Sequence, residues 1–308
     1  MKIATRINSF LPEYDNDLER VFEKFNDIGL THVDLNYPEH VKGYTNDKIK
    51  HLLEKHNLIA NGVALRFRDE FINGELGNSN IQTSNNALQL CKQACDFCRE
   101  IGGDVVTIWL GYDGFDYSFQ IDYVKVWEQI KTNIKEIAEY APDLKISIEY
   151  KPFQPRAYAF IDSFGIALSM IKEINKDNVG ITLDFCHMLM KHENPAYGAS
   201  ILGHQDKLYG IHLNDGYGLN DDGLMIGTSN LIKTIEFIYY SKLYNYDQAY
   251  YFDTFPVIED PVEECRANIN MIKKLDRVID QLGLDYFGNL IKQNKATKVS
   301  DFIVDILK

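Results

Sequence analysis

The stretch Lys145–Pro152 reads KISIEYKP, a short strand-like run that ends in a carboxylate, and this pattern decides the fold. It recurs three more times along the chain, each run ending in a residue that can ligate a divalent metal. The four residues are Glu149, Asp184, His212 and Asp253. Because parallel strands bring all their carboxyl ends to one side of a sheet, we expect these side chains to meet at one point.

Eight strand-like segments alternate with eight helical segments. The expected strands are Ile3–Ile7, Thr31–Leu35, Leu58–Leu65, Asp104–Trp109, Lys145–Glu149, Val179–Asp184, Leu208–Leu213 and Gln248–Asp253. The expected helices are Asp17–Ile28, Asn46–His56, Ser84–Ile101, Asp122–Tyr140, Ser163–Ile174, Asn194–Leu202, Ser229–Tyr240 and Asp260–Leu282. No GxGxxG follows the first strand, which weakens the alternative of an open dinucleotide-binding sheet. We therefore predict an α/β fold, a (β/α)8 TIM barrel over residues 1–282.

Residues 283–308 are additional to the eight units. Their apolar residues predict a C-terminal helical extension that packs on the barrel or on a neighbouring subunit of a homo-oligomer. These residues are Leu290, Ile291, Phe302, Ile303, Ile306 and Leu307.

Composition narrows the class of protein. A formal net charge of -13 over 308 residues argues against a nucleic-acid partner, because phosphate binding needs clustered Lys and Arg. The chain has no apolar run long enough to cross a membrane and no export signal at Met1, so we expect no membrane partner. Cys91, Cys95 and Cys98 recur at helical spacing and predict a buried helix face, so a reducing cytoplasm fits best.

The donor set favours a divalent cation. Three carboxylates and one imidazole suit Mn²⁺, Mg²⁺, Co²⁺ or Zn²⁺. Lys151 lies two residues after Glu149, so along an extended backbone both side chains point to the same face. His187 follows Asp184 by three residues, where it could serve a second metal or a substrate hydroxyl.

Taken in chain order, these motifs resemble the metal-binding signatures of the xylose isomerase-like barrel superfamily, and most closely the xylose and L-rhamnose isomerase type. The motifs are Glu149-Tyr150-Lys151-Pro152 with Pro155-Arg156, then Asp184 with His187, then Ile211-His212-Leu213-Asn214, then Phe252-Asp253. The resemblance implies a barrel that binds one or two divalent ions and interconverts an aldose monosaccharide with its ketose.

The resemblance also assigns roles. The metal that grips two sugar oxygens would be held by Glu149, Asp184, His212 and Asp253, and Lys151 would hydrogen-bond the carbonyl oxygen. Asp253 could shuttle a proton, and the residues leave both a hydride shift and an enediol route open. A second metal would be held by His187, Asp221 and Asp222, with Asp184 shared. Trp109 resembles an aromatic wall, and the loops around Phe67, Arg68, Phe153 and Phe255 would set specificity.

The chain departs from the xylose isomerase pattern in three places. Gly223 stands where the second aspartate of the seventh loop is found, which puts the second metal in question. Asn36-Tyr37 replaces the histidine used for ring opening, which argues against xylose as the substrate. His212 stands where xylose isomerases carry a carboxylate, a feature shared with rhamnose isomerases and ketose 3-epimerases.

Three other functions stay open. A ketose 3-epimerase would use Glu149 and Asp253 on either face of one carbon, although such enzymes usually carry Glu at the position of Asp253 and lack Lys151. An abasic-site endonuclease would need more histidines and a basic groove. A catalytically silent sugar-binding barrel would keep the fold without turnover.

Overall fold

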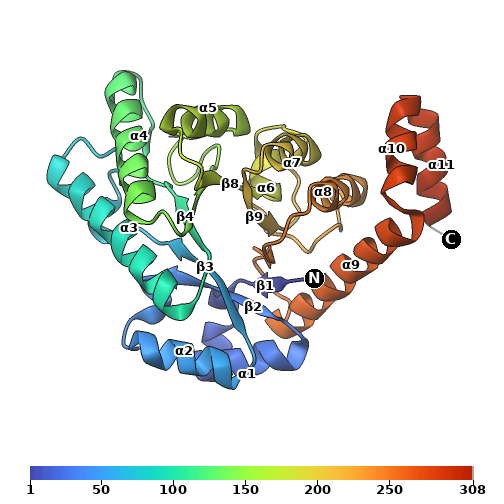
Figure 1. The fold of residues 1–308 in the computed structure, drawn as a ribbon, viewed down its shortest axis with the longest axis horizontal. Helices are drawn as coiled ribbons and strands as arrows, with labels where there is room; N and C mark the ends of the chain where they lie inside the picture. Colours follow the sequence, from blue (N-terminus) through green and yellow to red (C-terminus); the bar gives the residue numbers. More distant parts are fainter. Residues whose placement is uncertain (307–308) are drawn as a thin grey trace.

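A nearly closed ring of parallel strands lies at the centre of the computed structural model, which describes residues 1–306 (Figure 1). Eight strands form one parallel sheet in the order β1-β10-β9-β8-β6-β4-β3-β2. They are β1 Ile3–Thr5, β2 His32–Tyr37, β3 Ile59–Leu65, β4 Val105–Trp109, β6 Lys145–Glu149, β8 Val179–Asp184, β9 Leu208–Leu213 and β10 Tyr250–Phe252. The prediction of a TIM barrel is confirmed.

The ring closes between β1 and β2 by a few separate hydrogen bonds and not by paired strand residues. β1 and β2 are the two ends of the sheet order. Between them, the N–H of Thr31 donates to the carbonyl of Ile3 at 3.1 Å, and the N–H of Ile3 donates to Thr31 Oγ1 at 3.0 Å. The barrel is therefore nearly closed.

Helices surround the sheet, and most begin where a short polar side chain can cap them. They are α1 Leu18–Ile28, α2 Asn46–Lys55, α3 Ile81–Ile101, α4 Tyr123–Tyr140, α5 Phe164–Ile174, α7 Pro195–His204, α8 Leu231–Leu243 and α9 Pro261–Leu282. Asp17, Asn80 and Asp260, for example, each accept a hydrogen bond from a first-turn N–H. Cys91, Cys95 and Cys98 are buried on α3, which confirms the predicted helix face.

Several element ends and short elements differ from the sequence prediction. The first strand ends at Thr5 instead of Ile7, because Ile7 begins the 3-10 helix η1. The last strand is shorter than Gln248–Asp253. The prediction did not include α6 Phe185–Met190, the antiparallel pair β5 Gly114–Phe115 and β7 Tyr158–Ala159, or the 3-10 helices η1 Ile7–Ser9, η2 Leu11–Tyr14, η3 Glu39–Val41 and η4 Asp69–Phe71.

Two further helices, α10 Leu284–Gln293 and α11 Ala296–Ile306, lie side by side beyond the end of α9 (Figure 1). The Phe287 ring lies 5.2 Å from that of Tyr239 on α8 and 5.6 Å from that of Phe302 on α11. Aromatic contacts therefore join the extension to the helical layer of the barrel. Leu307, which was expected in this extension, lies outside the described residues.

The sheet separates two environments. Apolar side chains fill the space between strands and helices, whereas Ser147 and Thr182, on the inner face, hydrogen-bond to each other at 2.6 Å. Ser147 lies two residues before Glu149, so both side chains point into the barrel. None of the helices within residues 1–306 is both long and apolar enough to cross a membrane.

Candidate metal centre at the mouth of the barrel

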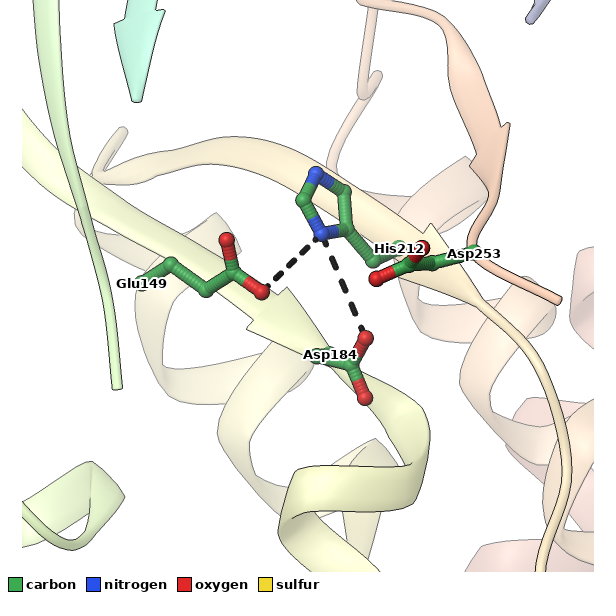
Figure 2. A group of neighbouring side chains, drawn as sticks. All are labelled: Glu149, Asp184, His212 and Asp253. Atoms are coloured by element: carbon green, nitrogen blue, oxygen red, sulfur yellow. Dashed lines mark hydrogen bonds and ion pairs between the residues drawn. The ribbon is translucent and has the colours of Figure 1, made fainter. Parts of the chain in front are cut away.

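The four predicted ligands converge at the carboxyl ends of adjacent strands (Figure 2). One ligand atom from each side chain lies within 4.8 Å of the others. Glu149, Asp184 and His212 come from β6, β8 and β9, and Asp253 follows β10 directly. All four are buried. Parallel pairing of the strands brings together residues that are distant in sequence.

Asn214 holds the Asp184 carboxylate and the backbone of Asp253 in place. Its Nδ2 donates to Asp184 Oδ1 at 3.2 Å, to Asp184 Oδ2 at 3.1 Å and to the backbone carbonyl of Asp253 at 3.2 Å. Its Oδ1 accepts from the N–H of Cys186 at 2.8 Å. Asp184 also caps α6, because its Oδ1 accepts from the N–H of His187 at 2.9 Å. The orientation of Asp184 is therefore fixed from both sides.

Burial and the neighbouring charges shift the pKa of Asp184, Glu149 and His212. Burial raises the pKa of Asp184 to about 7, and the nearby carboxylates of Asp221, Asp253 and Glu149 add to this shift. Burial alone would also raise the pKa of Glu149, but the charges of His212 and His187 hold it at about 2. Burial would lower the pKa of His212, but the carboxylates around it, Glu149 first, raise it to about 9. The pocket attracts positive charge.

A divalent cation fits this set of donors. Asp253 Oδ1 is buried and accepts no hydrogen bond within the described part of the chain, and the nearest cation is Arg6 Nε at 3.7 Å. His212 Nδ1 lies 3.2 Å from Glu149 Oε1 and 4.0 Å from Asp184 Oδ2. A buried orphan oxygen beside two further carboxylates and an imidazole is the environment of a bound metal ion. These four residues could hold it.

A second cluster shares Asp184 with the first and adds His187 and Asp221. His187 Nδ1 donates to the carbonyl of Tyr150 at 3.0 Å, and its Nε2 lies 3.3 Å from Asp221 Oδ2. Lys151 Nζ donates to the same Asp221 oxygen at 2.8 Å. Although burial opposes ionisation of both groups, the charges of Asp184 and then Asp221 raise the pKa of His187 to about 9, and the charges of His187 and Lys151 lower the pKa of Asp221.

Asp222, the third predicted ligand of a second metal, does not join this cluster. Its Oδ2 accepts from the N–H of Tyr217 at 2.7 Å. Gly223 next to it has a φ of 56°, and a Cβ at that position would lie 2.3 Å from the Phe255 ring. The aromatic ring fills the space that a side chain at position 223 would need.

The predicted substrate-binding residues divide into two groups. The Trp109 ring lies next to the candidate metal centre: Lys151 Nζ is 5.7 Å and the Arg66 guanidinium is 5.8 Å from its ring centroid. Phe67, in contrast, is buried in the core against Phe71, and half-exposed Arg68 pairs with Glu39 at 3.5 Å. The structure therefore brings Trp109 to the cluster but not Phe67 or Arg68.

Two other aromatic residues border the barrel mouth. Phe153 is half-buried in the loop that follows Lys151. Phe255 lies beneath the Arg6 guanidinium at 4.5 Å.

Several residues near the site were missed. Arg6, Arg66 and Asn214 follow β1, β3 and β9, so their position just after a strand was a usable signal. The Tyr251 ring packs 4.7 Å from the His212 ring, and its place two residues before Asp253 predicts an inward side chain.

His40 lies near the position of the missing ring-opening histidine, but both of its ring nitrogens are engaged. Its Nδ1 accepts from the N–H of Asn36 at 3.0 Å, and its Nε2 contacts Asn8 Oδ1 at 3.0 Å. Burial and the charges of Arg66 and Arg6 lower its pKa to about 3. His40 is therefore a fixed, neutral group.

Comparison with known proteins identifies the class. A sequence profile described as a xylose isomerase-like TIM barrel matches residues 22–275, so the chain belongs to this family. The xylose isomerase of Thermus thermophilus is 26% identical over 151 residues, 47% of this chain and 39% of that enzyme. The chain therefore matches well under half the length of this relative. The resemblance drawn from the motifs is confirmed.

Solved structures share the fold. A D-tagatose 3-epimerase-like protein superposes with a TM-score of 0.71 at 20% identity, covering 91% of this chain and 99% of that one. An L-ribulose 3-epimerase superposes with a TM-score of 0.70 at 14% identity, covering 86% and 92%. At these identities the similarity establishes the barrel and leaves the reaction open.

Proposed function

We propose that this protein is a metal-dependent aldose–ketose isomerase that moves hydrogen between C1 and C2 of a monosaccharide. The observation that carries the proposal is the position of Lys151, whose ammonium group is bonded to Asp221 of the second cluster, and that cluster shares Asp184 with the first. An ammonium ion in this position can stabilise negative charge on a carbonyl oxygen. The partial match to xylose isomerases supports the same reaction.

The side chains around the proposed substrate have separate tasks. A divalent ion held by Glu149, Asp184, His212 and Asp253 would polarise two adjacent sugar oxygens as a Lewis acid. Lys151 donates to the carbonyl oxygen while Asp221 holds the ammonium in place. The Asp253 carboxylate takes a proton from the neighbouring hydroxyl and returns it to the former carbonyl oxygen, so that the reaction releases no net proton. Trp109 keeps water away from the reacting carbons.

Charge balance favours one ion. The cluster contains four carboxylates, and the positive charges of Lys151, Arg6 and Arg66 act on them. One divalent ion would offset the remaining negative charge with both imidazoles uncharged, whereas a second ion would add two uncompensated positive charges in a buried site. We therefore propose that the ammonium of Lys151 takes the place of a second metal.

Ketose 3-epimerisation is the second candidate, because Glu149 and Asp253 lie in one cluster and several similar structures are described as ketose 3-epimerases. That reaction needs two carboxylates on opposite faces of one carbon. In this chain that reaction would leave Lys151 without an assigned role.

A panel of pentoses, hexoses and deoxyhexoses separates the candidates. Protein loaded with Mn²⁺, Mg²⁺ or Co²⁺ is incubated with each ketose, and the products are resolved by chromatography and NMR. An aldose product supports the isomerase, and a ketose inverted at C3 supports the epimerase. Sugar binding without turnover would indicate a silent barrel. Metal analysis of the same samples tests the proposed ratio of one ion per chain.

A further inference from the structure

Two buried carboxylates outside the metal centre each accept hydrogen bonds from the backbone of the other's loop, at the mouth of the barrel. Asp113, in the loop after β4, accepts from the N–H of Glu75 at 2.8 Å and from the N–H of Gly77 at 2.8 Å. Glu75, in the loop after β3, accepts from the N–H of Tyr112 at 2.9 Å and from the N–H of Asp113 at 2.5 Å. We call this reciprocal pair the carboxylate clasp.

The clasp is costly to bury. Glu75 is 1% exposed and Asp113 is 3% exposed. Burial raises the pKa of Asp113 to about 6, and burial together with the charge of Asp113 raises the pKa of Glu75 well above its ordinary value. Backbone N–H groups compensate these carboxylates only in part. A buried pair that is this unfavourable indicates a role other than stability.

One side of the clasp is anchored on the helical layer. The carbonyl of Leu76 accepts from Ser84 Oγ at 2.8 Å and from Asn133 Nδ2 at 2.8 Å, which ties it to α3 and α4. The carbonyl of Asn78 accepts from Gln129 Nε2 of α4 at 2.8 Å. The segment that contains Glu75 is therefore fixed to two long helices.

The other side of the clasp leads to the proposed active site. Trp109 is four residues before Asp113, and its ring lies so close to Gly111 that a Cβ there would be 2.6 Å from two ring carbons. The carbonyl of Asp113 accepts from the N–H of Phe160 at 2.9 Å. Phe160 belongs to the loop that begins after Lys151. The clasp thus joins three consecutive loops.

We propose that Glu75 and Asp113 are positioning residues that fix the Trp109 ring beside the metal centre by tying its loop to α3 and α4. The statement that the Trp109 ring borders the substrate rests on the proposed function. The position of the ring is independent of the proposed function, so it can be measured without substrate.

Fluorescence of Trp109 tests the clasp. The chain has two tryptophans, so Trp127→Phe leaves Trp109 as the only source of tryptophan fluorescence. In that background Glu75→Gln keeps the side-chain volume but replaces one carboxylate oxygen with an NH₂ group. This NH₂ group cannot accept a hydrogen bond from the backbone N–H that it faces. We expect a red-shifted emission and stronger acrylamide quenching, with unchanged far-UV circular dichroism. Glu70→Gln, an exposed change in the same loop, is the matched control and should alter neither.

A folded Glu75→Gln protein with unchanged Trp109 emission and quenching would overturn the proposal. If the variant does not fold, hydrogen exchange on the unchanged protein decides. The N–H groups of Glu75, Gly77, Tyr112 and Asp113 should then be protected and exchange together. Rapid, independent exchange at Tyr112 and Asp113 would refute the clasp. A shifted Trp109 signal without turnover on any sugar would contradict the proposed function alone.

Discussion

Replacing Lys151 with methionine tests the central assignment of the active site. Methionine retains an unbranched side chain but removes the ammonium that lies 2.8 Å from Asp221 Oδ2. Lys151 is not among the grouped metal donors, so metal content should be unchanged. Loss of one preorganised donor to a developing oxyanion should lower kcat by about 10²–10³.

The effect on stability follows from burial. The side chains of Lys151 and Asp221 are 10% and 11% exposed, and removing one partner of a buried pair costs about 3–5 kcal/mol. His187 Nε2 still contacts Asp221 at 3.3 Å, so we expect the free energy of unfolding to fall by about 3 kcal/mol, the lower end of that range.

Three measurements on one preparation decide the outcome: steady-state kinetics, metal content by mass spectrometry and urea denaturation. Lys191→Met is the control, because it removes a partly exposed pair with Asp162 and should leave kcat unchanged. An unchanged kcat in Lys151→Met would refute the role of the ammonium. Loss of metal in proportion to loss of activity would show that Lys151 acts on metal binding instead.

Three further predictions concern the metal centre. Because the pKa of His212 is raised to about 9, a metal ion must displace a proton to bind, and the apparent metal affinity should rise about tenfold per pH unit from pH 7 to 9. Below pH 7 the affinity should change more steeply with pH, because Asp184 also binds a proton there. Competition with a chelator measures this dependence, and an affinity that does not change with pH contradicts it. Asp253→Asn should weaken metal binding about 10–100-fold in the same assay, and full retention of affinity would remove it from the ligand set. Asn214→Ala should lower the free energy of unfolding by about 2–3 kcal/mol, because the buried N–H of Cys186, the Asp184 carboxylate and the Asp253 carbonyl each lose a hydrogen-bond partner, and an unchanged urea midpoint would contradict this.

The sequence predicted regular elements best where apolar strands are fully buried. β6, β8 and β9 have the predicted bounds because each is a mostly buried run with a polar ligand at its last position, or, in β9, at the last position but one. The predicted ends of β1 and β10 were wrong, because a single hydrogen bond to the neighbouring strand decides where so short a strand ends. β5 and β7 contain two residues each, too few for any periodicity to show.

Within the site, the strand-end ligands were predictable and their supports were not. Glu149 and Asp184 follow from strand direction alone. Asn214 stands one residue beyond a strand, yet only the three-dimensional arrangement shows that its amide reaches both the Asp184 carboxylate and the Asp253 backbone carbonyl. The contacts of Glu75 with Asp113 depend on the conformations of two irregular loops, for which the sequence carries no periodic signal.

The Phe255 ring above Gly223 restricts how this lineage could acquire another metal. A carboxylate at position 223 would collide with the ring, since a Cβ there falls 2.3 Å from it. Replacing Phe255 first would remove the ring that stacks with Arg6. A carboxylate at position 223 therefore requires a smaller side chain at position 255. A bench evolution experiment toward bimetallic chemistry should begin from the paired substitution.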